Sequence, residues 1–251
     1  MIFLKRSRRF PFIPFILCRL GYGSEVPISV SKTLFFIQRS PNAGILVAMC
    51  HHSDSVGEIE RQFDDAVDVL RASRSRLAGR AARAAEVIVA SLRGGGCVYV
   101  FGNGGSAADA QHVAAELVGR FLVERRPLRA VALTTDSSVL SAIANDYDFR
   151  TVFARQLAGL GRAGDVAVGL TTSGNSPNVL AGLAEAKRMG MTTVAFTGDS
   201  GGQCAPLADI LLNVPATTSP RIQETHAVLY HIICSLVETS FAGETWSVIE
   251  T

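Results

Sequence analysis

Five short apolar segments, separated by stretches with helical periodicity, constrain the fold of this chain more than any other feature. Each segment is apolar throughout instead of alternating, which is typical of parallel strands buried on both faces of a sheet. The five segments are residues 97–101, 130–133, 166–170, 192–196 and 210–214. Predicted helices cover residues 107–121, 137–144, 151–160, 177–189 and 220–241, with a short turn near 202–207. The alternation predicts an α/β fold, a doubly wound five-stranded parallel sheet with helices on both faces and a ligand site at the carboxyl ends of the strands.

Two amphipathic N-terminal helices are predicted ahead of the first strand. In the first helix, one stripe is apolar: Ile59, Phe63, Ala66, Val67 and Leu70. The second covers residues 80–93 and ends at three consecutive glycines, which is a strong C-terminal stop signal. We expect these helices to pack on the sheet or on a partner subunit.

The charge distribution argues against a nucleic-acid partner. Residues 1–50 hold seven Lys and Arg against one Glu, although the whole chain has a net charge of only +2. The rest of the chain is therefore mildly acidic and lacks the basic stripe that duplex nucleic acid requires. The apolar run after Arg9 is too short for a membrane helix and holds two prolines, so we expect no membrane partner.

The composition also indicates the domain organisation and the compartment. We expect residues 1–54 to be a disordered tail or an extension translated from the wrong start, 55–243 to form the domain, and 244–251 to be a C-terminal tail. Five cysteines are scattered without a CxxC pair, which is typical of reduced core thiols in a cytoplasmic protein.

Two loops at the ends of predicted strands could hold a phosphate. After the first strand comes Gly102 followed by Asn103, Gly104, Gly105 and Ser106, where glycines let a ligand approach a helix N-terminus. The alternative is a tight turn that simply needs glycine. After the third strand come four hydroxyls, on Thr171, Thr172, Ser173 and Ser176. An ordinary N-cap needs one hydroxyl, so four favour an anion site.

Two pairs of polar residues on predicted helices could carry proton transfer or bind a metal. His112 and Glu116 are four residues apart and therefore share a helix face, although a solvated polar pair is the alternative. Gln223 and His231 share a face of the last helix, within an apolar stretch. A core histidine bonded to a backbone carbonyl is the alternative for His231, and we expect that role for His226.

Six motifs then identify a family that the chain resembles. They are GNGGS, DAQHVAAEL, AIANDYDF, TTSGNS, TGDSGG and RIQETHAVLYH. Their order and spacing resemble those of phosphoheptose isomerases, a branch of the SIS (sugar isomerase) domain proteins, over residues 58–241. The resemblance implies a flavodoxin-like sheet and a homotetramer with active sites between subunits. It also implies conversion of D-sedoheptulose 7-phosphate to D-glycero-D-manno-heptose 7-phosphate, on the way to ADP-heptose for lipopolysaccharide.

The resemblance also implies roles for individual residues. Glu116 would be the base that moves a proton between C1 and C2, and His231 its acid/base partner. Zinc would be bound by His112, Glu116, Gln223 and His231. Substrate contacts would be made by Asn103, Gly104, Gly105, Asn145, Asp146, Thr171, Thr172, Ser173, Ser176 and Gln223. Glutamine is an unusual zinc ligand, so metal binding could be weak or structural.

Two alternatives without catalysis remain within the same domain family. One is a tetrameric regulator that binds the replication initiator DnaA and has segments very like residues 102–108 and 110–116. That regulator lacks the histidine of the last helix and has an altered phosphate loop, whereas this chain keeps His231 and TTSGNS. The other is a module that senses sugar phosphates. The intact residues favour the enzyme.

Overall fold

The computed structural model describes residues 55–244 fully and, before them, only the backbone of five strands. The chain divides into two compact units, residues 1–64 and 65–251. In the first unit, β1 (Phe3–Lys5) and β2 (Phe15–Leu17) pair antiparallel, and so do β3 (Ile28–Val30), β4 (Thr33–Ser40) and β5 (Gly44–Cys50). The expected tails over 1–54 and 244–251 stay predictions, because outside these five strands and residue 244 they lie beyond the described residues.

The second unit contains the predicted five-stranded parallel sheet. Its strands are β6 (Val98–Gly102), β7 (Ala130–Ala132), β8 (Val166–Leu170), β9 (Thr192–Thr197) and β10 (Ile210–Asn213). They lie in the order β10-β9-β8-β6-β7, and every pairing is parallel. The chain leaves β6 toward one edge and returns on its other side as β8, so the switch point lies between these two strands. The loops after β6 and β8, which carry the two predicted phosphate motifs, therefore emerge side by side.

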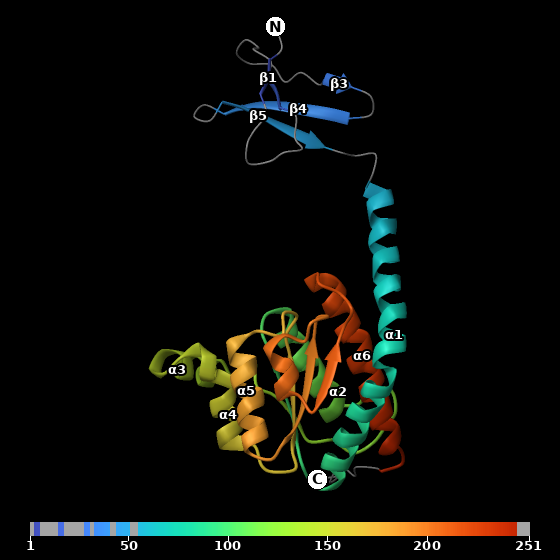
Figure 1. Ribbon diagram of the computed structural model, residues 1–251, viewed down its shortest axis with the longest axis vertical. Coiled ribbons are helices and arrows are strands. Elements are labelled where there is room, and N and C mark those ends of the chain that lie inside the picture. The colour runs from blue at the N-terminus through green and yellow to red at the C-terminus, as the bar shows by residue number, and fades with distance from the viewer. Residues whose placement is uncertain are drawn as a thin grey trace, which may run out of the picture. The chain divides into compact units, whose positions relative to one another are not determined.

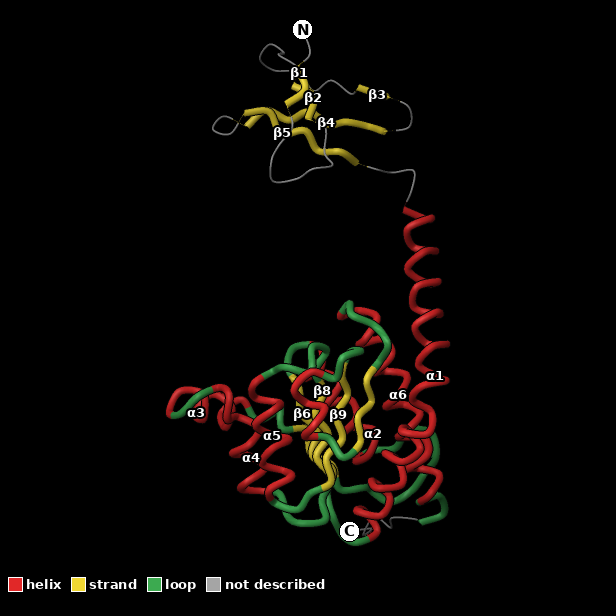
Figure 2. Tube along the Cα trace, in the orientation of Figure 1, coloured by secondary structure: helices red, strands yellow, loops and turns green. Residues whose placement is uncertain are grey.

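Helices cover both faces of the sheet, as Figures 1 and 2 show. One face is covered by α1 (Ser55–Arg93), α2 (Gly105–Val118) and α6 (Ser219–Ser240). The other is covered by α4 (Val152–Leu160) and α5 (Pro177–Arg188), next to α3 (Ser137–Asp146) and the short helices η1 (Phe149–Thr151) and η2 (Gly202–Leu207). Along β6, Val98 and Val100 face the first core while Tyr99 and Phe101 face the second. Burial on both sides explains why the strands are apolar at every position.

One continuous helix replaces the two N-terminal helices that the sequence predicted. Helix α1 runs through Gly79, and a Cβ atom added at this residue would have no other atom within 4 Å. An interior glycine costs about 1 kcal/mol relative to alanine, and burial of Leu77, Ala81 and Ala84 on either side offsets this cost. The predicted stripe near the start of the helix is not covered, since Ile59 is 54% exposed and Phe63 69%. In the described part of the chain, no helix combines the length and apolar character that a bilayer span demands.

Candidate active site

The loop after β6 lies against both α5 and α6. Gly104 has a φ of 56°, a left-handed conformation that glycine adopts without strain. The Asn103 and Asn178 side-chain amides exchange two hydrogen bonds of 2.8 Å, which join this loop to the start of α5. A Cβ atom at Gly105 would lie 2.6 Å from Gln223 Nε2, so the Gln223 side chain rests on the N-terminus of α2. Gln223 is thereby brought to the first loop, as its place in a shared site requires.

The loop after β8 gathers its hydroxyls in one place. Thr171 Oγ1 lies 2.9 Å from Ser176 Oγ and 3.4 Å from Ser173 Oγ. Ser176 is the N-cap residue of α5, but its side chain makes no capping hydrogen bond. Its hydroxyl therefore turns toward the loop interior, contrary to the ordinary N-cap alternative. Thr172 Oγ1 accepts a hydrogen bond of 3.4 Å from Ser219 at the start of α6, a residue that the motifs did not single out.

Two glycine-rich segments are in direct contact at this loop. Gly174 has a φ of 67°, and a Cβ atom there would lie 2.3 Å from the Gly201 carbonyl oxygen. The reverse holds for Gly202, whose Cβ would lie 2.6 Å from the Gly174 carbonyl oxygen. The TGDSGG segment therefore packs against the backbone of the β8 loop. A side chain at either glycine would clash with the opposite segment and displace the loop.

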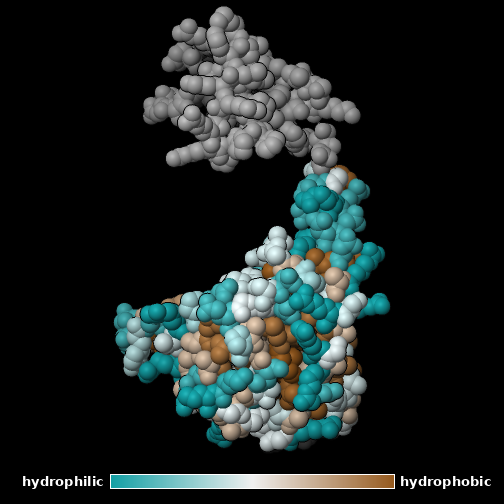
Figure 3. Space-filling view, viewed as in Figure 1, coloured by the Kyte–Doolittle hydropathy of each residue, from teal (hydrophilic) through white to brown (hydrophobic). Residues whose placement is uncertain are grey.

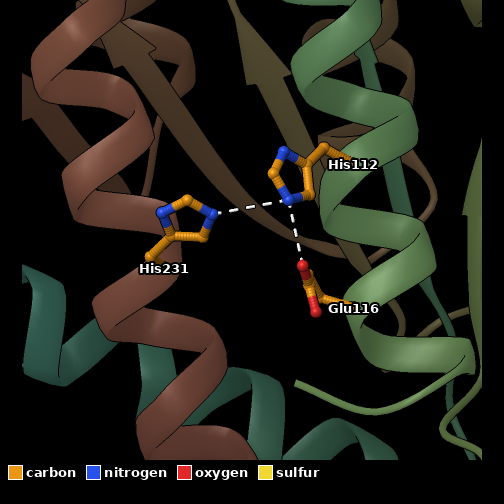
Figure 4. Close-up of side chains that lie close together, drawn as sticks. All are labelled: His112, Glu116 and His231. Carbon is orange, nitrogen blue, oxygen red and sulfur yellow. Dashed lines mark hydrogen bonds and ion pairs between the residues drawn. The ribbon is translucent and has the colours of Figure 1, made fainter. Parts of the chain in front are cut away.

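Helices α2 and α6 bring three predicted residues together, as Figure 4 shows. His112 Nε2 lies 2.9 Å from Glu116 Oε1 on the same helix and 3.4 Å from His231 Nε2 on α6. Glu116 has only 19% of its side chain exposed, whereas His112 has 44%. The two imidazole rings meet edge to face, with centroids 4.9 Å apart. Residues 119 positions apart in the chain thus form one cluster.

Three further residues, which sequence reasoning missed, surround this cluster. The Tyr230 hydroxyl lies 3.2 Å from His112 Nδ1 and donates a hydrogen bond of 3.4 Å to Asp109 Oδ1. Burial raises the pKa of Tyr230 to about 12, and burial also raises the pKa of Asp109. Phe121 stacks on His231, with ring centroids 5.7 Å apart. Tyr230 directly precedes His231 in the sequence, and Asp109 lies about one helical turn before His112. A search among the neighbours of the predicted residues could therefore have found both.

The contacts of Tyr230 bear on the tautomer of His112. With the Tyr230 proton donated to Asp109, the phenol oxygen accepts from His112 Nδ1, and the ring proton is assigned to that nitrogen. In this assignment His112 Nε2 can accept a proton or bind a cation beside the Glu116 carboxylate and His231 Nε2.

The cluster fits a metal ion by both chemistry and geometry. The ligand atoms of His112, Glu116 and His231 all lie within 4.8 Å of one another. Two ligands of a tetrahedral zinc, each 2.0–2.1 Å from the ion, lie roughly 3.3–3.4 Å apart. The separation of the two histidine Nε2 atoms is 3.4 Å. A hydrogen-bond partner on the other ring nitrogen, here the Tyr230 hydroxyl at His112 Nδ1, is also typical of such sites.

Asn145 and Asp146, two further predicted substrate contacts, lie elsewhere in the domain. They end helix α3, are exposed, and share one hydrogen bond of 2.8 Å. Figure 1 shows α3 on the opposite side of the domain from α6. The fold of the chain therefore does not bring these residues to the cluster of α2 and α6, and their contact with substrate stays a prediction.

His226 is a core histidine, in agreement with the role expected for it. It is 0% exposed, and its Nε2 lies 3.2 Å from the Thr197 carbonyl oxygen. Burial lowers the pKa of His226 to about 4, so the ring is neutral near pH 7.

Comparison with known proteins places these features in a family. Residues 62–198 match the SIS domain family. The chain is 51% identical over 181 residues to the phosphoheptose isomerase of Aquifex aeolicus, which covers 72% of this chain and 95% of the relative. The solved phosphoheptose isomerase of Neisseria gonorrhoeae matches with a TM-score of 0.69 and 42% identity, over 73% of this chain and 98% of that one. The solved enzyme of Francisella tularensis matches with a TM-score of 0.71 and 37% identity, over 74% and 98%.

Proposed function

This chain belongs to the phosphoheptose isomerase family of SIS-domain proteins and is a sugar-phosphate isomerase, and we propose that it converts D-sedoheptulose 7-phosphate to D-glycero-D-manno-heptose 7-phosphate through an enediol. The observation that carries the proposal is the convergence of a carboxylate and two imidazoles on α2 and α6, in a domain whose β8 loop gathers several hydroxyls. The product would enter ADP-heptose synthesis for lipopolysaccharide. Membership of an enzyme family also argues against a regulator of the initiator DnaA and against a sensor without catalysis.

The β8 loop and the start of α5 would hold the phosphate. Hydroxyls of Thr171, Ser173 and Ser176, which gather at the N-terminus of α5, would donate to phosphate oxygens without a lysine or arginine. Thr172, Asn103, Gly104, Gly105 and Ser106 complete the two neighbouring loops. The phosphate end is thereby fixed, and C1 and C2 of the sugar extend toward the α2 and α6 cluster.

Glu116 would remove the C1 proton as general base and return it at C2. Its carboxylate is mostly shielded from water but keeps one charged or polar neighbour, His112, within hydrogen-bond distance. His231 would move the second proton between the oxygens on C1 and C2 as the enediol forms and collapses. Both steps require the two helices to hold these side chains within reach of the same two carbons.

His112, Glu116 and His231 would hold zinc, with Gln223 as the expected fourth ligand. What zinc supplies when bound is Lewis-acid polarisation of the carbonyl oxygen. The role of Tyr230 in this arrangement is to keep the proton of His112 on Nδ1.

We also propose a cytoplasmic homotetramer whose active sites lie between subunits. Helix α6 exposes an apolar stripe of Val228, Ile232 and Leu236, which are 40%, 46% and 44% exposed, and His231 lies beside it. Figure 3 shows brown apolar surface among the teal polar side chains of the domain. A partner subunit that covered the stripe would also close the active site and could supply Asn145 and Asp146. The three described cysteines are free and buried, which fits a reducing compartment.

Incubation of the purified protein with sedoheptulose 7-phosphate tests the proposal. We expect an aldose 7-phosphate product, detected by its anomeric NMR signals, and incorporation of one solvent deuteron at C2 in D₂O. An active preparation that isomerises other ketose phosphates but leaves this one unchanged would overturn the choice of substrate.

A further inference from the structure

A buried ion pair lies next to the active site but takes no part in the chemistry described above. The Arg125 side chain is 0% exposed and that of Glu238 is 3% exposed, with Arg125 Nε 3.6 Å from Glu238 Oε1. Removal of two charges from water is expensive, and well-packed apolar residues often stabilise a fold equally well. The pair therefore invites an explanation other than stability.

The Glu238 carboxylate organises the loop between α2 and β7. It accepts backbone hydrogen bonds from Phe121, Leu122 and Val123, of 2.8, 2.7 and 2.9 Å. Burial alone would raise the pKa of Glu238, but these three N–H groups and Arg125 outweigh it and lower the pKa below its ordinary value. A carboxylate from α6 thus fixes three consecutive residues of a loop that is more than a hundred positions away in the chain.

The Arg125 guanidinium ties the same loop to the last turn of α2. It donates hydrogen bonds to the backbone carbonyl oxygens of Glu116 at 2.7 Å, Gly119 at 2.9 Å and Arg126 at 3.0 Å. The final carbonyls of a helix have no partner within the helix, and a cation there is favourable. The backbone of Glu116 is therefore held by Arg125.

The loop then reaches the second catalytic candidate through Phe121. The backbone N–H of Phe121 is bound by Glu238, and its ring stacks on His231 at an interplanar angle of 27°. Glu238 follows His231 by seven residues, about two helical turns, so both lie on the same side of α6. One ion pair is therefore linked to the backbone of Glu116 on one side and to the ring of His231 on the other.

We propose that Glu238 and Arg125 are positioning residues for the isomerisation, acting on Glu116 through its backbone and on His231 through the Phe121 ring. The inference rests on the proposed roles of Glu116 and His231. A histidine side chain has two rotatable bonds, and the stacked phenyl ring restricts the orientations that the imidazole can adopt. Because misplacement of a reacting group by about 1 Å can cost on the order of 10² in rate, loss of the stack should lower kcat more than it changes KM.

Phe121→Leu and Glu238→Gln test the proposal. Leucine at position 121 keeps apolar bulk but cannot stack on His231. Glutamine at position 238 keeps the shape of Glu238 but places an NH₂ donor against the N–H donors of the loop. We expect each variant to lower kcat at least tenfold with KM within twofold of the wild type. Crystal structures should show His231 Nε2 displaced from its place 3.4 Å from His112 Nε2.

Phe153→Leu is the matched control. Phe153 is 2% exposed in the core on the other face of the sheet, so its replacement should lower the melting temperature and leave kcat unchanged. If Phe121→Leu resembles Phe153→Leu, with wild-type kcat and an unmoved His231, the proposal is wrong. If Glu238→Gln does not fold, Phe121→Leu decides. If the wild-type protein does not turn over sedoheptulose 7-phosphate, the proposed substrate fails, and the position of His231 in the variant structures still decides the positioning role.

Discussion

Replacement of Glu116 by glutamine tests the proposed base. The change keeps the size and shape of the residue and removes its negative charge and its capacity to take a proton. The Glu116 side chain has one close polar contact, with His112 Nε2 at 2.9 Å, and the His112 side chain is 44% exposed. A polar pair that is partly open to water contributes about 0–1 kcal/mol, so the free energy of unfolding should change by no more than that amount.

The effect on catalysis should be far larger than the effect on folding. Loss of a general base costs typically 10²–10⁴ in rate, which corresponds to about 3–5 kcal/mol of activation free energy. We expect turnover of sedoheptulose 7-phosphate to fall by that factor or below detection. The assay is the initial rate of aldose formation, with the circular dichroism melting curve measured on the same preparation.

Glu185→Gln is the control for loss of a carboxylate as such. Glu185 lies in α5, pairs with Arg188 at 2.6 Å and is 20% exposed, close to the 19% of Glu116. The Glu185→Gln variant should keep the wild-type rate of turnover. Zinc content, measured on both variants, separates a lost base from a lost ligand: Glu116→Gln that retains metal but not turnover supports the base. Near-normal turnover by Glu116→Gln would refute the assignment.

Three further predictions concern α6. His231→Asn should lower kcat by roughly 10²–10⁴, and unchanged kinetics would return His231 to a structural role. Tyr230→Phe removes the hydroxyl that holds His112 Nδ1, so zinc affinity in a chelator competition should fall by about 10–100-fold; wild-type affinity would contradict the assigned tautomer. His226 has an ordinary pKa of 6.5 and a folded pKa of about 4, so the unfolded state binds the extra proton between these values. The free energy of unfolding therefore has its full value above pH 6.5, where His226 is neutral in both states. It decreases as the pH falls toward 4, by about 3 kcal/mol in total. Urea unfolding of the wild type and of His226→Gln over this pH range measures it, and equal slopes for the two proteins would contradict it.

Much of the fold could be read from the sequence because its signals are local. Continuous apolar runs predict buried parallel strands, and the order of strands and helices leaves few topologies that a right-handed crossover allows. The N-terminal helices were the exception. Two apolar stripes, over residues 59–70 and 80–93, predicted two helices, whereas packing of Leu77 and Ala81 keeps α1 continuous.

The candidate site was only partly accessible to the same reasoning. His112 and Glu116 share a helix face, so their 2.9 Å contact follows from helical geometry. The motifs also identified His231, but no local pattern places it 3.4 Å from His112. The Glu238 carboxylate carried no signal, because the loop N–H groups that it binds lie more than a hundred positions away in the chain.

The sequence by itself therefore determined the five strands of the sheet, the helices that follow them, the two loops at the switch point and the family. Periodicity and loop chemistry are properties of neighbouring residues, so they can be recognised in the sequence alone. Only the tertiary structure decided which helix faces meet, which polar groups surround His112, and that a buried ion pair links the two catalytic candidates. Those features depend on distances between side chains more than a hundred residues apart, which close packing of α2 against α6 sets.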